Sequence, residues 1–222
     1  MKDKRKSAEE AVASVKSGST IMVGGFLANG TPEILIDALI ESGVDELTVI
    51  CNDGGYPARG VGKLIALKRV KKLIASHVGL NPDVAEQMNE GTLEVELIPQ
   101  GTLAERISAA GKGIGGFYTP TGVGTMVATN KEMRNINGKK YLLELPLYAD
   151  FALIRGSVTD MQGNMVYNKS TRNFNPIMAT AAKHVIAATE KLVETGELIP
   201  EHIVTPGVYV DVIVEGEAKC QM

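Results

Sequence analysis

The stretch that decides the fold lies near the amino terminus and reads Thr20-Ile21-Met22-Val23-Gly24-Gly25-Phe26-Leu27-Ala28-Asn29-Gly30-Thr31-Pro32. Its first four residues are β-branched or apolar and predict a short strand. Thr31 is a typical helix N-cap, and Pro32 suits the first helical position because its missing N–H needs no partner there. The glycines between them let bare backbone approach a ligand. We therefore expect a strand, a ligand-binding loop and a helix, although a turn without a ligand fits the same residues.

Strand and helix signals alternate on both sides of this loop. The expected strands cover residues 20–23, 47–51, 70–75, 93–98, 151–154, 185–188 and 209–214; the expected helices cover residues 7–16, 32–42, 82–90 and 102–110, with one more starting near Pro176. This alternation predicts an α/β fold with an open, mostly parallel sheet and helices on both faces. Asn137-Gly138 lies between two strand-like runs and predicts an added antiparallel hairpin with a type I′ turn. We expect residues 1–222 to form a single domain without an internal repeat.

Composition argues against several classes of protein. The chain of 222 residues has a formal net charge of -3, so no basic excess indicates nucleic acid or an anionic membrane as a partner. No apolar run approaches the roughly 20 residues of a membrane span, and the start of the chain lacks the apolar core of a signal peptide. We expect a cytoplasmic protein. Two cysteines, Cys51 and Cys220, and histidines without metal-binding spacing predict neither a disulfide framework nor a metal site.

Glycine is concentrated in residues 111–125, where we expect a long loop that acts as a lid or as an interface segment. The residues themselves do not separate these two roles. The run from Gly111 to Gly116 has the form G-x-G-x-x-G, but it follows an expected helix instead of a strand. This context disfavours a dinucleotide site.

A series of motifs resembles the small, first subunit of family I CoA-transferases, in the same order. The motifs are Gly24-Gly25-Phe26 with Gly30-Thr31-Pro32, Ser76-His77-Val78-Gly79 with Asn81-Pro82, Pro99-Gln100-Gly101-Thr102, Gly115-Gly116-Phe117 with Thr119-Pro120-Thr121-Gly122-Val123-Gly124-Thr125, and Arg172-Asn173-Phe174-Asn175-Pro176. Each motif is weak alone, and together they are specific. The resemblance runs from about Ala8 to about Val214.

The resemblance implies the α subunit of a heteromeric CoA-transferase of the acetate/butyrate–acetoacetate type, with the open α/β sheet of that family. Such enzymes move CoA between short-chain acyl-CoA and carboxylic acids by a ping-pong mechanism through a glutamyl-CoA thioester. Their glutamate lies in a Ser-Glu-Asn-Gly run of the second subunit, and no Glu-Asn-Gly occurs here. The resemblance therefore implies no catalytic residue in this chain and a partner β subunit, in an assembly of two α and two β subunits or larger. It implies a CoA thioester as substrate, with no metal and no permanently bound cofactor.

The resemblance also assigns substrate-binding residues. It places the CoA-binding loop at Gly24, Gly25, Phe26, Leu27, Ala28, Asn29 and Gly30. Asn52 and Gln100 match polar side chains of the acyl or oxyanion pocket, but Asn52 also fits an Asx-type turn, and Gln100 also fits a helix cap. We expect a larger side chain at Gly25 to block the ligand or to distort the loop, because its bulk points into a site, and to leave the core intact.

Other functions remain open from the sequence. The first is a 3-oxoacid CoA-transferase subunit that uses succinyl-CoA, and the second is a non-catalytic CoA-binding protein. A sugar-phosphate isomerase-like enzyme rests on fold analogy alone.

Overall fold

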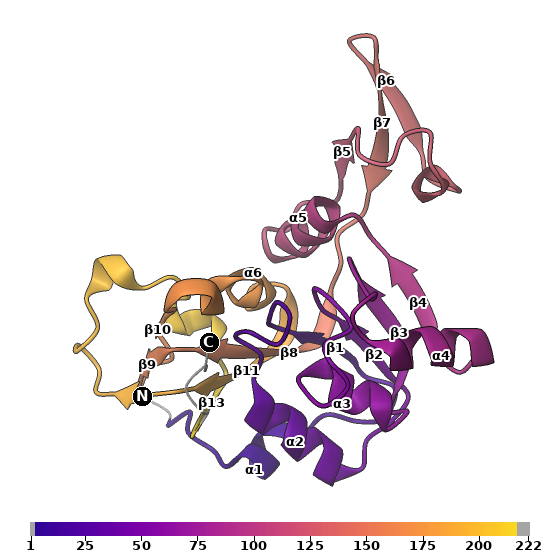
Figure 1. Cartoon of the computed structure of the whole chain (residues 1–222). Helices are drawn as coiled ribbons and strands as arrows, with labels where there is room; N and C mark the ends of the chain where they lie inside the picture. Colours follow the sequence, from indigo (N-terminus) through magenta and orange to yellow (C-terminus); the bar gives the residue numbers. More distant parts are fainter. Residues whose placement is uncertain (1–2, 217–222) are drawn as a thin grey trace.

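The computed structural model describes residues 3–216, so Cys220 lies outside the described residues (Figure 1). A 7-stranded sheet has the order β13-β11-β8-β1-β2-β3-β4. Its strands are β1 Thr20–Val23, β2 Leu47–Ile50, β3 Val70–Ala75, β4 Glu94–Leu97, β8 Ala149–Gly156, β11 Ala182–Thr189 and β13 Val212–Glu215. All neighbouring strands in this sheet pair in parallel. The expected open, parallel α/β sheet is confirmed.

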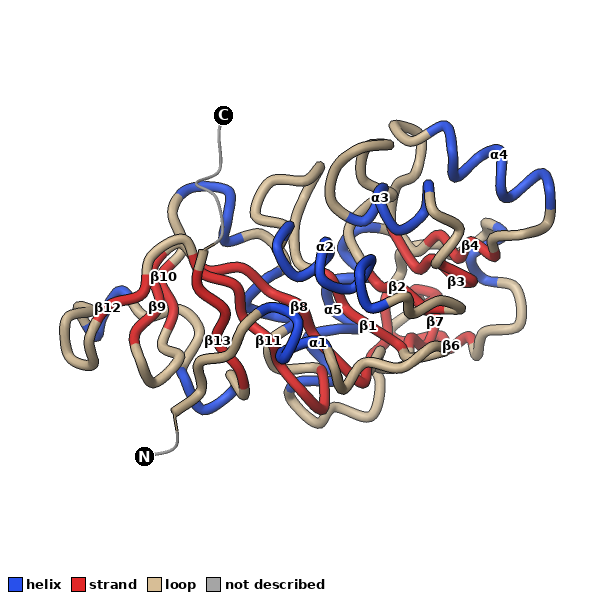
Figure 2. Tube along the Cα trace, turned by 90° about the horizontal axis from the view of Figure 1, so that it is seen from below, coloured by secondary structure: helices blue, strands red, loops and turns tan. Residues whose placement is uncertain are grey.

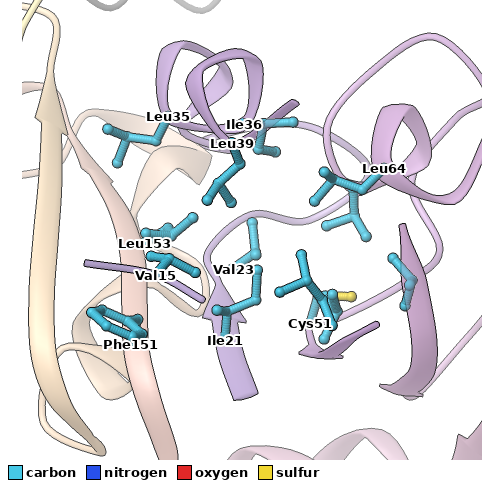
Figure 3. Packing of buried hydrophobic residues seen from close by; sticks show 14 of the residues in the cluster. Val15, Ile21, Val23, Leu35, Ile36, Leu39, Cys51, Leu64, Phe151 and Leu153 are labelled. Atoms are coloured by element: carbon cyan, nitrogen blue, oxygen red, sulfur yellow. The ribbon is translucent and has the colours of Figure 1, made fainter. Parts of the chain in front are cut away.

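Helices cover both faces of the sheet, as expected. Successive strand residues point to opposite faces, so Ile21 and Val23 join one apolar cluster while Met22 joins the other. The first cluster packs under α1 Ala8–Val12, α2 Glu33–Ser42, α3 Val61–Ala66 and α4 Pro82–Glu90. Figure 3 shows Leu39 of α2 directed toward this face of the sheet. The second cluster packs under α5 Gln100–Gly111 and α6 Asn175–Met178.

The direction of strand addition reverses beside β1. From β1 the chain builds outward through β2, β3 and β4, and it then returns to add β8, β11 and β13 on the other side. Figure 2 shows the strands in this order across the molecule. Open parallel sheets bind ligands outside the carboxyl ends of their strands at such a reversal. The Gly24–Gly30 loop leaves β1 at this position.

A small antiparallel sheet projects from the body as an arm (Figure 1). Its order is β5-β7-β6, with β5 Phe117–Thr119, β6 Met133–Ile136 and β7 Lys139–Glu144. Asn137 and Gly138 have φ values of 51° and 81°, which confirms the type I′ hairpin. The expectation of an irregular loop over residues 111–125 was wrong in part, because Phe117 to Thr119 pair with β7.

Several element boundaries also differ from expectation. Ser7 and Glu10 form the expected capping box, but α1 ends at Val12 and not near Lys16, whose N–H bonds to the Ser19 hydroxyl at 3.1 Å. The helix after the glycine loop begins at Glu33, and its cap residue is Pro32 without a side-chain cap from Thr31.

In the second half of the chain, the helix expected near Pro176 is the single turn α6. Tyr209, expected in the last strand, lies in η4 Gly207–Tyr209, because its N–H closes a turn onto the Pro206 carbonyl at 3.1 Å. The remaining elements were not expected; they are α3 Val61–Ala66, η1 Met126–Ala128, η2 Lys169–Arg172, η3 Pro200–His202, β9 Val158–Asp160, β10 Met165–Val166 and β12 Leu192–Val193. Within residues 3–216, no helix combines the length and the apolar character needed to cross a membrane.

Candidate functional site

The Gly24–Gly30 loop closes as a two-residue hairpin turn. The N–H of Phe26 donates to the Asn29 carbonyl at 3.0 Å, and the N–H of Asn29 donates to the Phe26 carbonyl at 2.9 Å. Between them, Leu27 and Ala28 have φ values of 48° and 62°. Residues with a Cβ rarely adopt this region, and such strain persists only where neighbouring groups enforce it. The loop is therefore held in shape by the rest of the protein.

Part of that support comes from the first residue of α6 and the segment before it. Asn173 Oδ1 accepts from the Gly25 N–H at 3.1 Å, and Asn173 Nδ2 donates to the Asn29 carbonyl at 2.9 Å. Asn175, which is completely buried, donates to the Gly30 carbonyl at 3.0 Å and accepts from the Arg155 N–H of β8 at 2.9 Å. Asn173 therefore binds the loop at two points, and Asn175 binds the loop to β8.

The glycines of the loop are required by this packing. A Cβ on Gly24 would lie 1.8 Å from Oδ1 of Asn175, and one on Gly25 would lie 2.1 Å from Oγ1 of Thr31. Both contacts are with the protein's own side chains. Of the two effects expected of a larger side chain at Gly25, distortion of the loop fits this packing, because Thr31 already fills the space into which the side chain points.

A second loop of the same design follows β2. It reads Gly54-Gly55-Tyr56-Pro57-Ala58-Arg59-Gly60, which matches the first loop at Gly-Gly, an aromatic residue, Ala and the final Gly. In each loop the aromatic residue pairs with the residue three positions later, Phe26 with Asn29 and Tyr56 with Arg59. The expectation of no internal repeat was wrong, because the strand, loop and helix unit occurs twice. The repeated pattern was present in the sequence.

The buried carboxyl group of Asp53 joins the two loops. Its Oδ2 accepts from the Leu27 N–H of the first loop at 2.8 Å, and its Oδ1 accepts from the Gly55 N–H of the second loop at 2.9 Å. The Asx-type turn considered for this segment exists, and Asp53 forms it instead of Asn52. The nearby Cys51 thiol is a poor nucleophile, because burial, followed by the Asp53 charge, raises its pKa well above the usual range.

The structure brings Asn52 and Gln100 together. Gln100 Nε2 donates to Asn52 Oδ1 at 2.6 Å, and Asn52 Nδ2 donates to Asp53 Oδ2 at 2.6 Å. Gln100 does not cap a helix, because the cap residue of α5 is Pro99 and no side chain caps it. Ser76, directly after β3, completes the cluster: its hydroxyl lies within hydrogen-bond distance of two acceptors, Gln100 Oε1 and, at 2.7 Å, the Asn52 carbonyl, which share its one proton. No role was expected for Ser76, although it opens one of the matched motifs.

These side chains form a polar surface at the carboxyl ends of β2, β3 and β4. Gln100 is exposed, and one N–H of its amide is used by Asn52, so a second N–H can bind a developing negative charge on oxygen. Asp53 is only 6% exposed and accepts three hydrogen bonds, which leaves its carboxyl group unsuited to attack a substrate. The cavity between the loops measures about 10 Å³, which leaves room for about one water and for no larger molecule. Among the described residues, no three metal-binding side chains gather in one place.

Comparisons with known proteins agree with the motifs. The chain matches the sequence model of a family described as Coenzyme A transferase over residues 5–216. It is 50% identical to the alpha chain of acetate CoA-transferase from Escherichia coli (strain K12), over 99% of this chain and 100% of that protein. It is 53% identical to the acetoacetyl-CoA:acetate/butyrate CoA transferase alpha subunit of Clostridium acetobutylicum, over 91% of this chain and 93% of that protein. It is also 48% identical to the first subunit of a probable succinyl-CoA:3-ketoacid coenzyme A transferase from Bacillus subtilis (strain 168), over 96% and 90% respectively.

A solved structure shows the same fold. It is an acyl-CoA transferase from Escherichia coli O157:H7 in a thioester complex with CoA, with a TM-score of 0.86 at 22% sequence identity. The match covers 99% of this chain and 48% of that one, so the present chain spans about half of the solved chain. By family model and by sequence identity, the chain belongs to the coenzyme A transferase family.

Proposed function

We propose that this chain is the α subunit of a heteromeric CoA-transferase that moves CoA between short-chain acyl-CoA thioesters and the carboxylic acids acetate, butyrate and acetoacetate. The observation that carries the proposal is the cluster of Asn52, Ser76 and Gln100 beside the Gly24–Gly30 loop. This surface offers neutral hydrogen-bond donors, while its carboxyl group is buried and fully engaged. It is suited to stabilise an oxyanion, and it leaves the attacking carboxylate to a second chain.

The proposed reaction passes through a glutamate of the β subunit. That carboxylate attacks the thioester carbonyl, which forms a mixed anhydride and releases CoA thiolate. The thiolate then attacks the glutamyl carbonyl, releases the first acid and leaves a glutamyl-CoA thioester. An incoming carboxylate takes the CoA by the reverse steps, so the overall exchange is ping-pong. No permanently bound cofactor takes part.

Each step forms a tetrahedral intermediate with a negative oxygen. One correctly placed donor is worth about 2.7–4 kcal/mol to such a transition state. We assign this donor to the outward N–H of the Gln100 amide, and we assign CoA binding to the loop formed by Gly24, Gly25, Phe26, Leu27, Ala28, Asn29 and Gly30. Support comes from the position of the loop, at the place where the order of strand addition reverses.

Reconstitution tests this function. The purified chain alone should transfer no CoA, and addition of a β subunit should give transfer from acetoacetyl-CoA to carboxylic acids. Turnover by the chain alone, with β subunit excluded by mass spectrometry, would contradict the proposal. Binding of CoA without transfer in the complex would favour a non-catalytic CoA-binding protein.

The choice of acid is tested in the same assay. One methylene in an apolar pocket is worth only about 1–3 kcal/mol, so acetate and butyrate should have kcat/KM values within about 100-fold of each other. Succinate should be far poorer, because no cluster of arginines accompanies the matched motifs to bind a second carboxylate. The 48% identical relative makes the succinyl-CoA:3-ketoacid type the second candidate. Succinate equal to or better than butyrate would establish that candidate.

A further inference from the structure

We infer that Asp53 is a positioning residue, which sets the direction of the hydrogen bonds between Asn52 and Gln100 and holds the Gly24–Gly30 loop in its strained turn. The inference rests on the proposed function, because Gln100 is the group through which Asp53 acts on the reaction. The three hydrogen bonds that Asp53 accepts come from Leu27, Asn52 and Gly55. They reach both glycine loops and the polar cluster.

The carboxylate dictates the orientation of two amides. An ionised carboxylate only accepts hydrogen bonds, so the amide of Asn52 must turn its Nδ2 toward Asp53, at 2.6 Å. Its Oδ1 is then left to face Gln100, which must present Nε2 to it, also at 2.6 Å. Asn52 is only 3% exposed, so water has little access to replace these partners.

The orientation of the Gln100 amide also determines its hydrogen bond with Ser76. With Nε2 turned toward Asn52, Gln100 leaves its Oε1 for the Ser76 hydroxyl, which donates to it. The Asn52 carbonyl lies 2.7 Å from the same hydroxyl, so the one proton of Ser76 is shared between two acceptors and Ser76 stays beside the end of β2. The Gln100 amide therefore has one fixed orientation, and its remaining N–H is held as a donor at the surface.

Replacement of Asp53 by asparagine would remove this constraint without changing the shape of the side chain. An asparagine both donates and accepts, so the Asn52 amide could turn its oxygen toward position 53 and its Nδ2 toward Gln100. Gln100 would then turn its oxygen to Asn52 and its amide nitrogen to Ser76, and the donor at the surface would move. At Leu27, the backbone N–H would face either the amide nitrogen, which cannot accept, or a neutral oxygen in place of a charged one.

The test compares Asp53→Asn with a matched control, Asp160→Asn, in the reconstituted complex. Asp160 accepts from the N–H groups of Gln162 and Asn164 at 2.9 Å and from the Asn164 side-chain amide at 2.8 Å, and it is 2% exposed. It therefore has the same kinds of partner as Asp53, but it lies in β9, away from the glycine loops (Figure 1). Asp53→Asn should lower kcat about 100-fold with a smaller change in KM, while Asp160→Asn should leave kcat unchanged. Equal effects of the two variants on kcat would overturn the inference.

A double-mutant cycle with Gln100→Ala tests whether Asp53 acts through Gln100. If it does, Asp53→Asn should lower kcat little further once Gln100 is alanine. Independent, multiplying losses of kcat would contradict the inference, because a general loss of structure would not depend on Gln100.

Hydrogen exchange in the isolated chain separates this inference from the proposed function. The Leu27 amide should lose protection in Asp53→Asn and keep it in Asp160→Asn. If the wild-type complex transfers no CoA, the proposed function fails, but this measurement still tests the role of Asp53 in holding the loop. Unchanged protection of Leu27 in Asp53→Asn would refute that role.

Discussion

The substitution Gly25→Ala adds one methyl group where the glycine loop turns back on itself. Gly25 has a φ of 130°, and the new Cβ would lie 2.1 Å from Oγ1, 3.2 Å from Cβ and 3.3 Å from Cα of Thr31. Thr31 is buried, and Arg155 donates to its carbonyl at 3.2 Å. The threonine therefore has little freedom to move away, and we expect the substitution to destabilise the folded chain.

The cost has two parts. A non-glycine residue in this region of φ costs about 1–3 kcal/mol, and an extra methyl group in a filled space costs about 1–3 kcal/mol more. We expect a total near 3–4 kcal/mol, which lowers the melting temperature of a chain of this size by about 6–16 °C. Gly91→Ala is the control, because Gly91 has a φ of 73° but nothing within 4 Å of the added Cβ. It should show only the conformational cost of about 1–2 kcal/mol.

Urea and thermal unfolding of the isolated chain measure both variants. Gly25→Ala must be the less stable of the two if the space beside Gly25 is filled by Thr31. Equal stabilities would refute the reasoning. Loss of CoA transfer in a Gly25→Ala complex of wild-type stability would show instead that the added methyl group points into the substrate site.

Further predictions concern the sheet and the arm. The pKa of Asp150 is lowered, first by the Lys183 side chain at 2.9 Å and then by the Thr20 N–H at 3.0 Å. Its contribution to the free energy of unfolding is therefore present above the unfolded-state pKa of about 3.9 and is lost as the pH falls through the lower folded pKa. Urea unfolding at pH 5 and pH 3 should show a smaller loss of stability for Asp150→Asn than for wild type, and an equal loss would contradict this assignment. Asn137→Val places a β-branched residue at a φ of 51°, so hydrogen exchange in β6 and β7 should speed up while the melting of the main sheet stays unchanged. Unaltered exchange in both strands would show that the turn does not hold the arm together.

The parts of the fold that could be predicted have local causes. The alternation of apolar strands with capped helices predicted the parallel sheet, and the two residues Asn137-Gly138 predicted the hairpin of β6 and β7. Some of the missed strands depend on distant partners. β5 is three residues long and exists because β7 pairs with it, and β9 pairs with β12 although Thr159 and Leu192 lie far apart in the chain.

The candidate site likewise contains residues that could be identified from the sequence and residues that could not. The resemblance to the family singled out the Gly24–Gly30 loop, Asn52 and Gln100 as site residues. The sequence could not show that Asn52 and Gln100, 48 positions apart, share a hydrogen bond. Ser76 and Asp53 escaped notice because their importance lies in what they contact, and the chain brings these contacts together only when the ends of β1, β2 and β3 are side by side.

The two glycine loops share a pairing pattern, but only one of them is strained at its centre. Pro57 occupies the place of Leu27 in the second loop, and its ring holds φ near about -65°, so that turn needs no positive φ there. Leu27 and Ala28 have no such help, and both have positive φ. The carboxyl group that supports Leu27 belongs to Asp53, which precedes the unstrained loop. The second loop can therefore support the first as a rigid element. The strain is confined to the first loop, which lies where the order of strand addition reverses. Open parallel sheets bind their ligands at such a position.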